Sequence, residues 1–137
     1  MKFNTTICTT LLLVDDDRHQ LDLRSLVLKK SGFMVLTAAS PIEALALLAQ
    51  PVGRKVNVAI LDYEMPGMNG CVLADYLKAR YPELKIILHS GLLEIPESEM
   101  SSVDSFVPKG NGILQLLGRI SPLGNTAQIG PLPRISG

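Results

Sequence analysis

Polar side chains follow four of the most apolar segments of this 137-residue sequence. The acidic run 15–17 comes directly after LLLV, and Asp62 follows VAIL. Ser90 follows KIILH, and Lys109 follows SFVP. Carboxylates held close together repel one another and require a cation, and a site made of oxygen ligands suits Mg²⁺. These residue types therefore predict a magnesium site that also carries one amine and one hydroxyl.

Phosphoryl transfer to a carboxylate is the reaction that this set of groups fits. A carboxylate can act as a covalent nucleophile, and positioned cations stabilise the charge on the transferred group. Asp62 is the expected acceptor, because it is the single acid at the end of its segment. The turns at Pro66-Gly67 and Asn69-Gly70 let backbone groups approach the metal and the phosphate closely. Asp15 and Asp16 are the expected additional metal ligands.

Alternating apolar and amphipathic segments supply the elements that would position these groups. The β-rich runs are 9–14, 33–38, 56–61, 84–88 and 103–107. The helical patterns are 18–31, a segment that starts at the capping box Ser40-Pro41-Ile42-Glu43, 70–80 and 111–120, with at most a short, weak helix over 96–102. This alternation predicts an α/β fold, a doubly wound five-stranded parallel sheet with helices on both faces. Ligands of such sheets bind beyond the carboxyl ends of the strands.

Apolar stripes on the predicted helices indicate which faces cover the sheet. On the first helix the stripe is expected at Leu23, Leu26 and Val27. Residues 121–137 are rich in Gly and Pro and have no periodicity, so we expect a domain over 9–120 and a flexible tail over 121–137.

Composition excludes several classes of protein. Thirteen basic and thirteen acidic residues cancel, and Trp is absent, so neither charge nor aromatic content favours nucleic-acid binding. Two cysteines without CxxC spacing favour reduced thiols and a cytoplasmic location. The apolar run near the N-terminus ends in DDD and is too short to cross a membrane.

Four motifs in order, LLLVDDD, ILDYEMPGMNG, LHSG and FVPKG, resemble the receiver domain of bacterial two-component response regulators. The resemblance covers about residues 9–120. It implies the flavodoxin-like strand order 2-1-3-4-5, and phosphorylation by a phosphohistidine on a sensor histidine kinase or a phosphotransfer protein. It also implies that the domain is not a turnover enzyme but undergoes Mg²⁺-dependent self-phosphorylation and autodephosphorylation.

The resemblance assigns a metal-binding role to four residues. It makes Asp62 the phosphoacceptor and a metal ligand, and Asp16 a direct ligand of Mg²⁺. Asp15 would act through a water molecule. The backbone carbonyl of Glu64 would complete the share of the coordination that the protein provides.

The same resemblance implies a conformational switch. Ser90 stands where the family has Thr or Ser, Lys109 is the phosphate-binding lysine, and Phe106 occupies the switch position. Phosphorylation would draw Ser90 and Lys109 to the phosphoryl group and let Phe106 fill the vacated space. The altered surface would bind a downstream effector protein, and the chain would be a monomer or a phosphorylation-linked homodimer.

Two other functions fit part of the pattern. A phosphatase of the haloacid-dehalogenase type also places acids after its first strand, with Ser and Lys at later strand ends. That class requires a further acidic pair after the lysine, and no Asp or Glu occurs beyond Asp104. The third reading is a protein-interaction module in which the pocket is intact but never phosphorylated.

Overall fold

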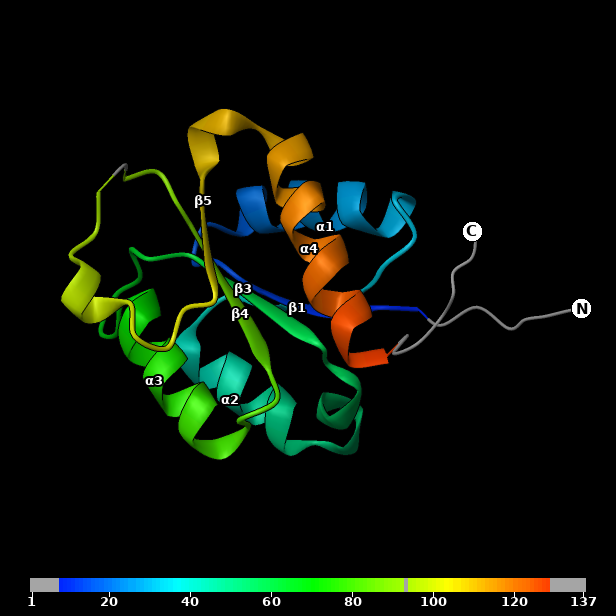
Figure 1. Cartoon of the computed structure of the whole chain (residues 1–137), viewed down its shortest axis with the longest axis horizontal. Helices are drawn as coiled ribbons and strands as arrows, with labels where there is room; N and C mark the ends of the chain where they lie inside the picture. Colours follow the sequence, from blue (N-terminus) through cyan, green and yellow to red (C-terminus); the bar gives the residue numbers. More distant parts are fainter. Residues whose placement is uncertain (1–7, 93, 129–137) are drawn as a thin grey trace, which may run out of the picture.

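A single parallel sheet organises the chain. The structure is a computed structural model that describes residues 8–92 and 94–128. Its strand order is β2-β1-β3-β4-β5, which confirms the predicted fold class (Figure 1). The strands are β1 Thr10–Val14, β2 Met34–Ala38, β3 Val58–Leu61, β4 Lys85–Ser90 and β5 Ser105–Pro108.

Helices cover the sheet on both faces. They are α1 Arg18–Lys30, α2 Pro41–Ala49, α3 Gly70–Arg80 and α4 Ile113–Gln128, with 3-10 turns η1 Pro51–Lys55, η2 Glu97–Glu99 and η3 Lys109–Asn111. Figure 1 shows α1 and α4 on one side of the sheet, with α2 and α3 on the other. Among the described residues, no helix is long and apolar enough to cross a membrane.

The three central strands are buried on both faces, which explains their nearly continuous apolar sequences. Successive side chains alternate between two separate cores. Leu12 and Val14 of β1 pack with α2 and α3, whereas Leu11 and Leu13 pack with α1 and α4. The sheet is therefore a rigid layer whose strand ends have fixed positions.

Side-chain caps begin the helices where the sequence indicates. Asp17 Oδ1 accepts hydrogen bonds from the backbone of His19 and Gln20 at the start of α1. At α2, the Ser40 hydroxyl accepts from the Glu43 N–H at 3.1 Å, and the Glu43 carboxylate accepts from the Ala39 N–H at 2.8 Å. This reciprocal pair confirms the predicted capping box in slightly shifted form.

The expected apolar stripe of α1 is wrong. Leu23, Leu26 and Val27 are exposed to 50%, 53% and 39%, and the sheet instead covers Leu21, Ser25 and Leu28. Both sets have helical spacing, but the buried side includes a polar residue, Ser25, which an apolar pattern assigns to solvent.

The end of the last helix also differs from expectation. We expected it at residue 120, but α4 continues to Gln128. A proline removes one backbone hydrogen bond, whereas extending a helix that is already formed costs little per residue. The turn before Pro122 is anchored by buried Leu116 and Ile120, and the Ser121 hydroxyl donates to the Leu117 carbonyl at 3.4 Å. Residues 129–137 of the predicted tail lie outside the described residues, and the proposed domain boundary stays a prediction.

The weak helix expected at 96–102 is reduced to the single turn η2. Of the described residues between β4 and β5, which are 91–92 and 94–104, only Glu97–Glu99 are helical. Three serines in this segment disfavour a helix, because they compete for backbone hydrogen bonds. The half-buried Phe106 of β5 consequently lines a groove together with Ile95, Pro96 and Met100, rather than packing beneath a regular helix.

Candidate functional site

The carboxyl edge of the sheet brings the two buried acids together. Val14 of β1 is in register with Leu61 of β3, so Asp15 and Asp62 follow on neighbouring strands. The Asp62 N–H donates to the Val14 carbonyl at 3.0 Å, which extends the strand pairing to the carboxylate residue itself. The acids are thus fixed by the sheet and do not depend on a mobile loop.

Asp15, Asp16 and Asp62 form a group that could hold a metal ion. One carboxylate oxygen of each lies within 4.8 Å of the others. Asp15 and Asp62 are buried, and Asp16 is exposed, so the group opens to solvent on the side of Asp16. Three oxygen ligands with room for water fit Mg²⁺, which binds few protein groups and keeps several waters.

Lys109 joins the acids from the other end of the sequence. Its Nζ lies 3.1 Å from Asp15 Oδ2 and 3.2 Å from Asp62 Oδ1. The residue begins η3 directly after β5, so the same edge of the sheet supplies it. The predicted convergence of these two acids and the amine is therefore present in the structure.

Arg24 is a second cation at the site, and sequence reasoning missed it. Its Nη1 lies 3.2 Å from Asp15 Oδ2, the oxygen that Lys109 also contacts. Arg24 lies on the sheet-facing side of α1, between buried Leu21 and Leu28. The signal that could have found it is a basic residue that lies one helical turn from buried leucines and nine residues after an acid at a strand end.

Burial and neighbouring charges shift the titration of Asp62. Burial raises the pKa of Asp62, and the carboxylates of Asp15 and Asp16 raise it further. Lys109 lowers the same pKa through its charge and its hydrogen bond, but it offsets these effects only in part. An additional cation at the site would therefore favour the ionised form of Asp62.

The turn after Asp62 packs against the strand end. A Cβ atom on Gly70 would lie 2.4 Å from the backbone carbonyl oxygen of Asp62, so only glycine fits there. The Gly70 N–H donates to the Tyr63 carbonyl at 2.9 Å. Asn69 caps α3 by accepting from Cys71 N–H at 2.9 Å, which fixes the start of that helix beside Asp62.

Ser90 lies at the same edge, but its hydroxyl is engaged elsewhere. It is the fully buried last residue of β4, and its Oγ accepts from the Leu92 N–H at 3.1 Å. Within the described part of the chain, no hydrogen bond joins it to Asp62 or Lys109. Glu64, two residues after Asp62, is exposed, and the half-buried Phe106 packs with the α2–α3 core.

His89 points away from Ser90, as strand alternation predicts. It lines a small cavity of about 190 Å³ with Arg24, Lys109 and residues of α1 and α4. Its side chain is buried, and Nε2 has no hydrogen-bond partner among the described residues. Burial, with nearby Arg24 and Lys109, lowers the pKa of His89 to about 4, so the imidazole is neutral at physiological pH.

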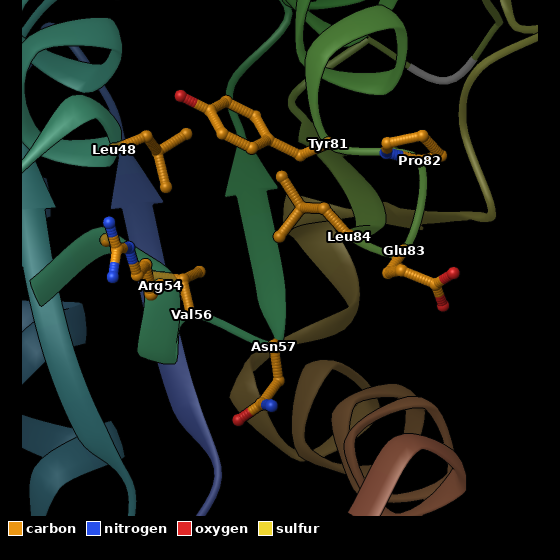
Figure 2. A pocket seen from close by; sticks show the side chains of 9 residues that line it. Leu48, Arg54, Val56, Asn57, Tyr81, Pro82, Glu83 and Leu84 are labelled. Atoms are coloured by element: carbon orange, nitrogen blue, oxygen red, sulfur yellow. The ribbon is translucent and has the colours of Figure 1, made fainter. Parts of the chain in front are cut away.

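A larger cavity lies at the opposite edge of the sheet. It measures about 340 Å³ and is lined mainly by apolar groups, among them Leu48, Val56, Tyr81 and Leu84 (Figure 2). Val56 and Leu84 precede β3 and β4, so this cavity is at the amino ends of the strands. It contains none of the acids of the metal group, and we assign the chemistry to the carboxyl edge.

Comparison with known proteins gives consistent results. Residues 11–120 match the family model described as response regulator receiver domain. The heme response regulator HssR of Staphylococcus haemolyticus is 32% identical over 120 residues, which cover 86% of this chain and 52% of HssR. The chain thus spans about half the length of this relative.

Two solved structures of TrrA share the fold and part of the sequence. TrrA from Thermotoga maritima in complex with Mg²⁺-BeF superposes with a TM-score of 0.75 at 26% identity, covering 84% of this chain and 98% of TrrA. TrrA in complex with the histidine kinase ThkA gives a TM-score of 0.76 at 26% identity, covering 84% and 97%.

Proposed function

This chain belongs to the response regulator receiver domains, and from that membership we propose that Asp62 accepts a phosphoryl group and thereby switches the domain. The observation that carries the proposal is the convergence of the acids and Lys109 at one edge of the sheet. The family match gives no support to the phosphatase alternative.

The proposed reaction forms an acyl phosphate on Asp62. A carboxylate oxygen attacks the phosphorus of a phosphohistidine, and an O–P bond forms as the N–P bond breaks. The electron pair of the broken bond returns to the imidazole of the donor. Lys109, 3.2 Å from Asp62 Oδ1, favours the ionised carboxylate before the attack and can neutralise phosphoryl oxygens afterwards.

Asp15, Asp16 and Asp62 would hold Mg²⁺, with the backbone carbonyl of Glu64 as a further ligand. When bound, the metal would neutralise negative charge on the acids and on the phosphoryl oxygens. The closeness of the three carboxylates supports this assignment, as does the Mg²⁺-BeF complex of TrrA. Asp15 Oδ2 already contacts two cations, which favours an indirect role for this residue.

The switch would move Ser90 and Lys109. The Ser90 hydroxyl would leave the Leu92 N–H and donate to a phosphoryl oxygen, while Lys109 would exchange Asp15 for the phosphoryl group. Phe106 would follow into the space beside β4. The groove that it lines with Ile95 and Met100 would change shape, and an effector protein would read that change.

A sensor histidine kinase or a phosphotransfer protein in the cytoplasm is the proposed donor. The complex of TrrA with ThkA supports a kinase as the partner. Exposed Leu23, Leu26 and Val27 of α1 give an apolar surface on the element that follows Asp15–Asp17. A donor protein that covers this surface would reach the acceptor. The chain would be a monomer or would form a phosphorylation-linked homodimer.

Uptake of phosphate from acetyl phosphate tests the function. With Mg²⁺, the wild-type chain should gain one phosphoryl group that hydroxylamine removes, and without Mg²⁺ it should gain none. Asp62→Asn should remain unlabelled, because an amide is not an adequate nucleophile. Equal labelling of Asp62→Asn would refute the assignment. An unlabelled wild-type chain would favour the interaction module.

A further inference from the structure

Asp15 is bonded on both carboxylate oxygens before any metal arrives. Oδ1 accepts from the Asp17 N–H at 2.9 Å, and Oδ2 contacts both Arg24 Nη1 at 3.2 Å and Lys109 Nζ at 3.1 Å. The side chains of Asp15 and Arg24 are exposed to only 4% and 16%, so water screens this pair weakly. Arg24 is thus part of the charged group and not a surface residue.

The two cations have unequal freedom. Lys109 contacts both Asp15 and Asp62, and the proposed reaction draws it toward a new phosphoryl group. Arg24 contacts Asp15 alone among the acids of the site, and it is carried by the middle of α1, where Leu21 and Leu28 anchor the helix to the sheet. When Lys109 leaves, Arg24 remains as the cation of Asp15.

Charge balance gives this arrangement a consequence. Three carboxylates face two cations, so the metal-free site carries one net negative charge. Bound Mg²⁺ adds two positive charges, and phosphorylation of Asp62 replaces one negative charge by two. The phosphorylated, magnesium-bound site is therefore neutral with Arg24 and carries a net negative charge without it.

We propose that Arg24 is a positioning residue that holds and neutralises Asp15, so that Lys109 is released to the phosphoryl group. The inference rests on the proposed function of Asp62. It predicts two opposite effects. Arg24 weakens binding of Mg²⁺ alone, because the two cations compete for Asp15. It strengthens binding of the phosphoryl group, because it compensates the added negative charge.

Titrations of the full chain with Mg²⁺ test the first effect by calorimetry. Arg24→Met keeps the length and apolar stem of the side chain but removes the charge, and it should bind Mg²⁺ about three- to tenfold more tightly than wild type. Arg24→Lys retains the charge and should lie closer to wild type. Arg18→Met is the matched control, since Arg18 is on the same helix but its pair with Glu43 is exposed.

Titrations with beryllofluoride at saturating Mg²⁺ test the second effect. This phosphoryl analogue should bind Arg24→Met about three- to tenfold more weakly than wild type, with Arg24→Lys intermediate and Arg18→Met unchanged. A purely structural role would loosen Asp15 and weaken both ligands, so the opposite signs separate the two explanations.

The outcomes distinguish this inference from the proposed function. If wild type binds both ligands and Arg24→Met binds both as wild type does, or both more weakly, the role of Arg24 is refuted and that of Asp62 is untouched. If wild type binds neither ligand, the proposed function fails and the inference fails with it. Should Arg24→Met not fold, Arg24→Gln provides the same comparison because it also removes the charge, and loss of the opposite signs in that variant counts against the inference.

Discussion

At the scale of the residue, the site consists of acids with different surroundings. Asp15 accepts a backbone hydrogen bond on one oxygen and is ion-paired on the other, Asp16 is exposed, and Asp62 is buried beside a single amine. A search of the sequence for polar residues at strand ends found all three acids together with Lys109. It missed Arg24, because a charged residue on the buried side of a helix contradicts the apolar pattern on which the search depends.

Asp62→Asn should stabilise the metal-free protein. The pKa of Asp62 is raised on folding, so the folded chain holds its proton more tightly, and wild type loses stability as pH rises through the raised pKa. The amide does not ionise and avoids this loss. Thermal unfolding at neutral pH should give a higher Tm for the variant without Mg²⁺, and Mg²⁺ should raise the Tm of wild type more.

The control for this experiment is Asp22→Asn, because Asp22 is exposed on α1 and is not one of the acids of the metal group. It should leave the Tm and its response to Mg²⁺ unchanged. A lower Tm for metal-free Asp62→Asn would mean that the ionised carboxylate stabilises the fold.

His89 should make the protein sensitive to acid. Its pKa is about 4 in the folded chain against an ordinary 6.5, so between these values the unfolded chain binds a proton that the folded chain does not. Stability should fall as pH decreases across this window, by about 3 kcal/mol. In His89→Leu that loss should be absent, as measured by urea unfolding from pH 7 to pH 4.

Exposed His19 provides the comparison, and His19→Gln should keep the acid dependence of wild type. If the stability of His89→Leu falls with acid as steeply as that of wild type, protonation of His89 is not the cause.

At the scale of the element, strands were predicted better than helix faces and ends. Buried parallel strands such as β3 have continuous apolar sequences, and few alternatives compete with that pattern. On α1, two sets of residues had helical spacing. Which set faces the sheet depended on Asp15, which contacts Arg24 of this helix only in the folded chain. The position of the Ser90 hydroxyl, bonded to Leu92, is a rotamer choice that no spacing encodes.

Gly70→Ala should disturb the acceptor through the start of α3. The added methyl group would lie 2.4 Å from the Asp62 carbonyl oxygen and 2.9 Å from Leu88, so the strand end must shift. We expect a loss of about 2–3 kcal/mol in the free energy of unfolding and slower phosphorylation by acetyl phosphate. Urea unfolding and the initial rate of labelling measure the two effects.

Gly118→Ala is the matched substitution, because it lies within α4 and its added Cβ meets no atom within 4 Å. It should stabilise the chain slightly, by about 0.5–1 kcal/mol, through helix propensity. A Gly70→Ala protein as stable and as rapidly labelled as wild type would show that the turn accommodates a side chain.

At the scale of the whole molecule, the sheet divides the chain into two cores with the site at their common edge. Asp62 and the turn after it adjoin the α2–α3 core, whereas Arg24 and His89 lie on the side of α1 and α4. The Tyr63 hydroxyl donates to Glu99 at 2.8 Å and thus connects the residue after the acceptor with η2. A structural change at Asp62 therefore occurs next to both the α2–α3 core and the segment that borders the groove at Phe106.

Locating the phosphoryl group is the most direct test of the central claim that Asp62 is the acceptor. After treatment with acetyl phosphate and Mg²⁺, reduction with borohydride converts a phosphorylated aspartate into homoserine, which peptide mass spectrometry identifies. We expect homoserine at position 62 and unchanged aspartate at positions 15 and 16. Homoserine at either of those positions, with Asp62 intact, would contradict it.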